Sequence, residues 1–246
     1  NLSSTYDGIL AGSLSLAKQG SGSLTLSKEN TYSGTTTVSG GSLVVTVDAA
    51  LPNTTPAAIA AGAELNFGDT LATLAAIDNS GTVKFGSASR ASLTVPGNIN
   101  NAVTGKFEFN AASLTLGGSL TSLGTFDSAN SSLTLNGVSG TTQSISLASD
   151  TTGRWLNVTH SGASDVVVNA PLEIANRLRK SGLGSFNVNG QPITTNQFSL
   201  DAGTVSDRLR TGAITATSDI ELTEGVVEAS LRGTAALKKS GEGEVT

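Results

Sequence analysis

Cysteine and methionine are both absent from this sequence of 246 residues, and aromatic residues make up only 4% of it. The lack of cysteine excludes disulfides, thiolate metal ligands and thiol nucleophiles. Because no methionine begins the chain, we expect Asn1 to be a processed or truncated start, with any export signal lying outside the sequence. A core of Leu, Val, Ile and Ala, with one tryptophan and 29 glycines, favours thin, layered β structure over a broad globular interior.

Charge is also scarce, at 13% of residues with a net charge of −5, and the charges are scattered. The chain therefore has no basic track for nucleic acid. The densest basic stretch, Arg177 to Lys180, precedes Ser-Gly, and this context favours a solvated loop. No apolar run approaches the ~20 residues of a membrane span. We expect no nucleic-acid partner and no membrane span in this segment, and this composition is typical of an exported bacterial surface protein.

What the sequence does contain is a recurring triplet of apolar, polar and apolar residues. Alternation with a period of two points two side chains of each triplet inward and one outward. Gly, Asn, Ser and Asp, which form turns, separate the triplets. The triplets fall in two series with spacings near 20 residues: Leu24-Thr25-Leu26, Leu43-Val44-Val45, Leu65-Asn66-Phe67 and Val83-Lys84-Phe85, then Leu93-Thr94-Val95, Leu114-Thr115-Leu116 and Leu133-Thr134-Leu135.

Self-similarity at about 20 residues is typical of a stacked architecture, in which each period forms one coil of a parallel β-helix. The sequence therefore predicts an all-β, right-handed parallel β-helix (a solenoid), almost without helix. Tandem antiparallel β-sandwiches are the alternative, because they also contain short strands with frequent turns. In that case Asn136-Gly137 and Asn189-Gly190 are candidate hairpin turns.

The chain divides into three parts on this pattern. Residues 1–149 are predicted to form regular coils, residues 150–228 to form less regular coils or a lateral insertion, and residues 229–246 to start a further copy of a repeat. The last part rests on identities offset by 221 residues, where Leu10, Gly12, Leu16, Lys18, Gly20, Gly22 and Thr25 match Leu231, Gly233, Leu237, Lys239, Gly241, Gly243 and Thr246.

Residues 20–45 read GSGSLTLSKENTYSGTTTVSGGSLVV and carry a family resemblance. The core Asn30-Thr31-Tyr32-Ser33-Gly34, the later Thr-Thr-Val and Gly-x-Leu, and a preceding Leu-x-Lys-x-Gly-x-Gly resemble the passenger-associated repeat of bacterial autotransporters. Lys28 and Glu29 depart mildly from that pattern. The resemblance covers roughly residues 8–95 and 229–246, and it implies a parallel β-helix within a long extracellular passenger. Passengers include adhesins and some enzymes, so the resemblance does not assign an activity.

Chemistry-bearing residues are few and dispersed. His160 is the only histidine and lies near Asp165, but no Gly-x-Ser-x-Gly elbow accompanies them, and His160 is predicted to end a strand. One imidazole without cysteines is a poor metal site. The acidic residues form one cluster, which consists of Asp219, Glu221, Glu224 and Glu228. Strand alternation places Asp219 and Glu221 on the same, solvated face. We predict no enzyme activity, and no catalytic, cofactor-binding or metal-binding residue.

The function expected from these features is structural: a rigid extracellular spacer, or a subunit of a bacterial surface filament or adhesin fibre. The alternatives are a receptor- or glycan-binding adhesin passenger, whose site lies in residues 150–225, and a polysaccharide-active enzyme. An interaction patch is predicted at Trp155, Arg177, Arg179 and Lys180. Expected partners are other copies of the chain, head to tail or as covalent tandem repeats, with the end near Thr246 meeting a segment that starts near Leu10, and a host or neighbouring-cell surface.

Overall fold

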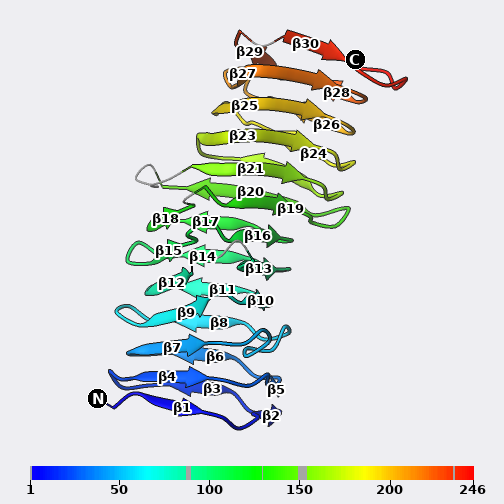
Figure 1. Ribbon diagram of the computed structural model, residues 1–246. Coiled ribbons are helices and arrows are strands. Elements are labelled where there is room, and N and C mark those ends of the chain that lie inside the picture. The colour runs from blue at the N-terminus through cyan, green and yellow to red at the C-terminus, as the bar shows by residue number, and fades with distance from the viewer. Residues whose placement is uncertain (1, 87–89, 129, 149–153, 235) are drawn as a thin grey trace.

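The computed structural model describes residues 2–86, 90–128, 130–148, 154–234 and 236–246, and these residues form β-strands and connecting segments without a helix. The strands stack in chain order from one end of an elongated column to the other (Figure 1). Every strand pair in the described part of the chain is parallel. The predicted parallel β-helix is confirmed.

Three sheets run along the column. Sheet I has eleven strands: β3 (Leu16–Lys18), β6 (Thr36–Val38), β8 (Ala57–Ile59), β11 (Ile77–Asn79), β14 (Ile99–Asn101), β17 (Leu120–Ser122), β20 (Thr142–Leu147), β22 (Asp165–Val168), β24 (Ser185–Asn187), β26 (Thr204–Ser206) and β28 (Val226–Val227). Sheet II has seven: β1 (Ser4–Tyr6), β4 (Ser23–Leu26), β7 (Ser42–Val45), β9 (Glu64–Gly68), β12 (Thr82–Phe85), β15 (Lys106–Glu108) and β18 (Thr125–Asp127).

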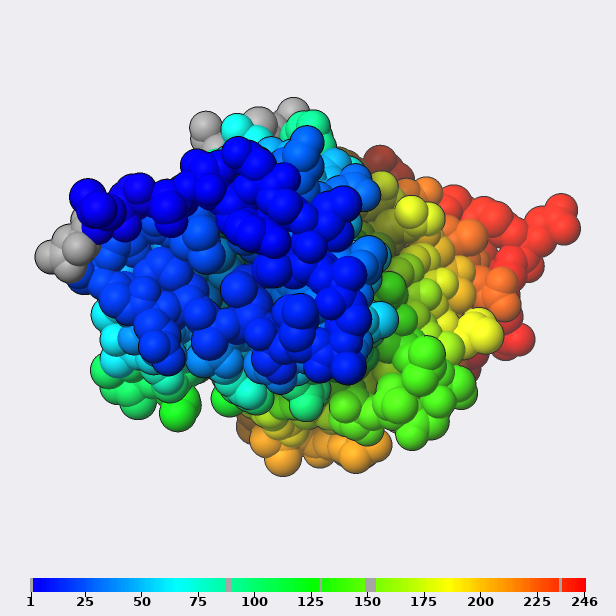
Figure 2. All heavy atoms as spheres, turned by 90° about the horizontal axis from the view of Figure 1, so that it is seen from below, coloured from blue at the N-terminus to red at the C-terminus, as the bar shows by residue number. Residues whose placement is uncertain are grey.

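Sheet III has ten strands: β10 (Leu71–Thr73), β13 (Ser92–Val95), β16 (Ser113–Leu116), β19 (Ser132–Leu135), β21 (Trp155–His160), β23 (Leu172–Lys180), β25 (Pro192–Leu200), β27 (Ala213–Leu222), β29 (Ser230–Arg232) and β30 (Ala236–Lys239). A small pair, β2 (Ala11–Gly12) and β5 (Thr31–Tyr32), lies beside the first coils. Viewed from the N-terminal end, the later coils fan out behind the first ones (Figure 2).

The triplets explain this stacking, because the first residue of a triplet lies beside another apolar residue one coil later. In sheet II, Leu24 pairs with Leu43, which in turn pairs with Leu65. In sheet III, Leu93 pairs with Leu114, which pairs with Leu133. All of these side chains except the partly buried Leu24 are in the core, while the residues between them face outward. Aromatic rings continue this inner ladder in the order Phe67, Phe85, Phe109, Phe107 and Phe126, with centroids 4.8–5.8 Å apart.

The β-sandwich alternative is wrong. Asn136-Gly137 follows β19 of sheet III and precedes β20 of sheet I, and Asn189-Gly190 joins β24 of sheet I to β25 of sheet III. Both dipeptides therefore turn the chain between different sheets. A hairpin would need them to join antiparallel neighbours in one sheet.

The coils after residue 154 are built differently from the earlier ones. Up to β27, each consists of one short strand of sheet I and one longer strand of sheet III, and the longer strands change register internally, for example between Glu173 and Arg177. Such a shift bends a strand, so one long strand turns where earlier coils use two separate strands. The division of the chain at residues 150 and 229 stays a prediction.

The asparagine of the repeat motif ties three successive coils together. The Asn30 side chain accepts a hydrogen bond from the backbone N–H of Leu10 (2.7 Å) and donates one to the carbonyl of Ala50 (2.7 Å). A second polar ladder lies inside the corner after sheet I, where Asn79 donates to Asn101 (2.8 Å) and Asn101 donates to Ser122 (2.9 Å). Because buried amides must be bonded, these ladders set the position of each coil over the next.

Candidate functional site

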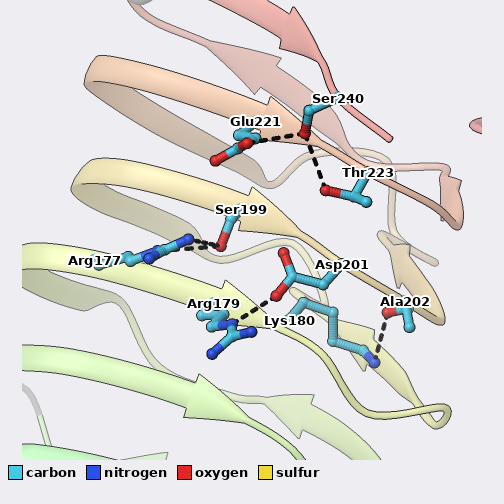
Figure 3. Close-up of polar contacts among 9 residues, drawn as sticks. All are labelled: Arg177, Arg179, Lys180, Ser199, Asp201, Ala202, Glu221, Thr223 and Ser240. Carbon is cyan, nitrogen blue, oxygen red and sulfur yellow. Dashed lines mark hydrogen bonds and ion pairs between the residues drawn. The ribbon is translucent and has the colours of Figure 1, made fainter. Parts of the chain in front are cut away.

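The basic stretch from Arg177 to Lys180 is the end of strand β23, so its prediction as a solvated loop is wrong. Strand alternation buries Leu178 and Lys180 and turns Arg177 and Arg179 outward. On the outside, the Arg177 guanidinium donates to the hydroxyl of Ser199 (Nε 3.2 Å, Nη2 3.0 Å) and Arg179 Nε donates to Asp201 Oδ2 (2.6 Å) (Figure 3). Both arginines therefore brace β23 against the following coil.

Trp155 does not lie on a surface patch either. Its side chain is only 3% exposed, and its ring centroid lies 5.8 Å from that of Phe126 and 6.3 Å from that of Phe109. The indole thus extends the aromatic ladder of the core into the longer coils. Since Trp155 and Lys180 are both internal, the predicted four-residue interaction patch is not a continuous surface.

Lys180 points into the corner between sheet III and sheet I. Its ammonium donates to the carbonyl oxygen of Gly182, in the same corner. It also donates to the carbonyl oxygen of Ala202 (3.2 Å), one coil further on (Figure 3). Burial lowers the pKa of Lys180 to about 8, while the negative charge of Asp165 acts in the opposite direction. The lysine works as a structural clamp, since its ammonium donates hydrogen bonds to backbone carbonyls of two successive coils.

The same clamp occurs three times, each on the sequence Lys-x-Gly-x-Gly. Lys18 donates to the carbonyls of Gln19 (2.8 Å), Gly20 (2.9 Å) and Gly40 (2.8 Å). At the far end, Lys239 donates to Thr223 (2.9 Å), Ser240 (3.0 Å) and Gly241 (3.1 Å). We call each of these a lysine corner, defined by residues 18–22, 180–184 and 239–243.

The second lysine corner was missed in the sequence, although a signal was present. Residues 178–184 read LRKSGLG, which is the same Leu-x-Lys-x-Gly-x-Gly as residues 16–22 and 237–243. The corners differ in position: Lys18 ends β3 of sheet I, whereas Lys180 and Lys239 end β23 and β30 of sheet III. One local motif therefore turns the chain at two different edges of the solenoid.

His160 ends strand β21, as predicted, and lies directly below Lys180 in the register of sheet III. The ring is fully buried, its centroid is 6.1 Å from that of Phe186, and neither ring nitrogen makes a hydrogen bond of good geometry within the described residues. Burial, together with the positive charge of Lys180, lowers the pKa of His160 to about 4, although the Ser164 backbone and Asp165 oppose this. The imidazole is therefore neutral at pH 7.

The candidate partners of a hydrolytic triad are engaged elsewhere. Asp165 Oδ1 accepts hydrogen bonds from both the backbone N–H and the hydroxyl of Ser185 (2.8 Å each), and these bonds lower the pKa of its carboxyl group. Both bonds hold β22 against β24, which are neighbours in sheet I. The absence of a catalytic role for His160 stays a prediction.

The first two acids of the predicted cluster also join successive coils. Asp219 accepts from Lys238 Nζ (2.9 Å), and this contact lowers the pKa of the Asp219 carboxyl. Glu221 accepts from the hydroxyl of Ser240 (2.8 Å), which also lies 3.2 Å from that of Thr223 (Figure 3). Within the ranges described above, no three His, Cys, Asp or Glu side chains gather as a metal site, and no helix is long and apolar enough to cross a membrane.

The lysine corners predict a specific sensitivity at the glycine facing them. Gly203 has a left-handed backbone (φ 79°), and a Cβ there would lie 2.5 Å from both Lys180 Nζ and the Gly182 carbonyl oxygen. We expect Gly203→Ala to lower the free energy of unfolding by about 2–4 kcal/mol, since backbone strain and overlap add. Urea unfolding followed by circular dichroism measures it.

Gly62 provides the matched control. Its backbone is also left-handed (φ 77°), but a Cβ would meet nothing within 4 Å. Gly62→Ala is expected to cost only about 1 kcal/mol, from backbone strain alone. Equal losses in the two variants would show that the lysine corner does not constrain Gly203.

Comparison with known proteins gives one match. A family model described as the passenger-associated-transport-repeat matches residues 16–45, a segment that runs from β3 to β7 and includes the first lysine corner and Asn30. No curated protein and no solved structure matches the chain. The matched repeat and the parallel β-solenoid agree with the resemblance that the sequence bears to β-helix repeat proteins of the autotransporter-passenger type.

Proposed function

We propose that this chain is a structural segment of an extracellular bacterial surface protein, acting as a rigid spacer or as a subunit of a filament or adhesin fibre. The observation that carries the proposal is the unbroken sheet I, whose eleven strands in the described residues follow one another in register from β3 to β28. In a solenoid each coil contacts only its neighbours, so length grows by adding coils while stability remains local. This geometry suits a spacer that holds two parts of a surface protein at a fixed distance.

Contacts between coils on the outer surface support the same role. Lys84 pairs with Glu64 (2.8 Å), Arg179 with Asp201 (2.6 Å) and Lys238 with Asp219 (2.9 Å), and each pair joins one coil to the next. Exposed ion pairs contribute only about 0–1 kcal/mol each. Repeated along a rod, they oppose sliding and bending of coils.

The partners that fit this role are other copies of the chain, arranged head to tail or as covalent tandem repeats. The outermost strands β1 and β30 are exposed along their length, and Leu237 in β30 is 66% exposed. Parallel strands with free edges pair readily with further strands. No reaction step is assigned to the chain, because His160, Asp165, Asp219 and Glu221 all serve packing or coil-to-coil contacts.

Removing one whole coil tests the spacer role. Ala57 and Ile77 are register partners in sheet I, so deleting residues 57–76 joins Pro56 to Ile77 and removes one complete turn. We expect a folded protein whose longest dimension is shorter by about 4.8 Å, the spacing of adjacent strands. Small-angle X-ray scattering measures this length, and a concentration series on the full chain shows whether copies add end to end.

Deleting only residues 57–66 is the control. That deletion removes half a coil and brings residues of sheet II to the place of sheet I, so the protein is expected not to fold. If both deletions unfold the protein, the coils are not independent units and the spacer proposal fails. It also fails if the whole-coil deletion folds without becoming shorter.

The adhesin alternative is favoured by one specific observation, a polar groove with free arginines near the C-terminal end of the stack.

A further inference from the structure

A groove of about 520 Å³ lies beside the loop that joins β26 to β27, residues 207–212. Its lining combines the loop with the following coil: Ser206, Asp207, Arg208, Arg210, Glu228 and Ser230. The volume lies within the range of about 300–1,000 Å³ that is common for small-ligand sites.

The loop is held in place by a buried carboxylate. Asp207 is only 6% exposed, its Oδ1 accepts the backbone N–H of Gly190 (2.7 Å), and its Oδ2 accepts that of Gly212 (2.7 Å). Its carbonyl oxygen also accepts the N–H of Arg210 (3.1 Å). A loop fixed in this way loses little conformational entropy when a ligand binds.

Two guanidinium groups at the groove are free. Arg208 and Arg210 are exposed, and neither side chain makes a hydrogen bond or close ion pair with the described residues; Arg208 acts only at longer range, on Asp165. In contrast, Arg90 and Arg179 are paired with Asp48 and Asp201. Arg210 also has a left-handed backbone (φ 56°), a conformation that most residues avoid and that points to a role for its placement.

We propose that this groove binds an acidic saccharide, with the sugar carboxylate on Arg208 and Arg210. Guanidinium groups bind carboxylates with two parallel hydrogen bonds, which gives both strength and orientation. The hydroxyls of Ser206 and Ser230 and the carboxylate of Glu228 also line the groove and suit sugar hydroxyls, which both donate and accept. This binding site goes beyond the spacer role and does not depend on it.

The same lining disfavours polyphosphates. Glu228 and Asp207 place negative charge beside the arginines, and the chain carries a net charge of −5. A ligand with one carboxylate per ring and many hydroxyls fits this mixture, whereas closely spaced phosphates would be repelled.

Titration calorimetry with a galacturonic acid tetrasaccharide tests the proposal on the full chain. We expect saturable binding with a Kd of about 0.1–1 mM, the affinity of a few good polar contacts. The double variant Arg208→Gln/Arg210→Gln is expected to lose at least about tenfold in affinity. The methyl-esterified tetrasaccharide, which lacks the charge but keeps the hydroxyls, is expected to bind at least about tenfold more weakly.

Arg177→Gln/Arg179→Gln is the matched control, since it removes two outward-facing arginines from sheet III without touching the groove. It is expected to bind like the unmodified chain. Equal loss in both double variants would show general attraction of anions and overturn the proposal, as would equal binding of the methyl ester or tighter binding of a sulfated glucan. Arg210→Gly separates binding from folding: it relieves the left-handed strain, so Tm is expected to stay or rise while affinity falls.

Discussion

Replacing Phe109 with alanine is expected to lower the free energy of unfolding by about 3–5 kcal/mol, the usual cost of truncating a fully buried phenylalanine. Its ring lies in the middle of the aromatic ladder, with centroids 5.4 Å from Phe85, 5.8 Å from Phe107 and 5.4 Å from Phe126. The side chain is fully buried, so its removal leaves a cavity that neighbouring coils can fill only by shifting out of register. Urea unfolding followed by tryptophan fluorescence measures the loss, because Trp155 lies 6.3 Å away.

Phe198 provides the comparison for this variant. It is buried to the same degree, but it has no ring neighbour in the described part of the chain. Phe198→Ala therefore removes the same apolar area without ring contacts, each of which is worth about 0.5–1.5 kcal/mol. We expect it to be less destabilising than Phe109→Ala by about 1 kcal/mol or more. A larger loss at Phe198 would mean that the aromatic ladder is not the main anchor of the core.

Replacing His160 with leucine is expected to remove an acid sensitivity from the fold. The imidazole has a pKa of about 4 in the folded chain, against about 6.5 when unfolded. Between these values the unfolded state binds more protons, so stability falls as the pH drops from about 6.5 towards 4. The difference corresponds to at most about 3 kcal/mol. Leucine suits the position because Leu135, its register partner on the preceding coil, faces the same interior.

Unfolding curves at pH 7.5 and 4.5 for both proteins measure this effect. Carboxylates also titrate in that range, so the informative quantity is the difference between the unmodified chain and the variant. His160 is the only histidine, which means that no second imidazole contributes to this difference. We expect the variant to gain stability relative to the unmodified chain at the lower pH. Parallel curves would show that the ring is protonated in the fold without penalty.

Much of the fold could be predicted because the triplets carry both the strand signal and the register. The sequence also contains a signal for the step from one sheet to another. Val83 and Leu93 are ten residues apart, which is half of a coil, and they lie in sheets II and III respectively. The sequence did not exclude hairpins, because Asn-Gly forms turns in parallel β-helices as well as in antiparallel β-sandwiches. Only the pairing of whole coils separates the two.

The candidate site was harder to predict, because burial in a solenoid is decided by the next coil. Lys180 is basic and precedes Ser-Gly, a context that predicts exposure to solvent, whereas its acceptor, the carbonyl of Ala202, lies 22 residues further along the chain. The sequence places Trp155 in a predicted surface patch, whereas the ring packs on Phe126 from an earlier coil. The groove at Arg208 and Arg210 was missed for a similar reason. Its anchor, Asp207, has one partner at Gly190, on the preceding coil.

The use of one corner motif at two edges of the solenoid affects how repeated units would display their surfaces. Residues 10–25 and 231–246 match in sequence, yet Lys18 closes the edge after sheet I and Lys239 closes the edge before it. Equivalent side chains of the two copies are therefore offset around the long axis by the width of sheet I. Units related in this way carry their identical features along a spiral stripe. A ligand that binds the same feature on two units must therefore wind around the rod. A ligand that approaches from one side contacts that feature on one unit only.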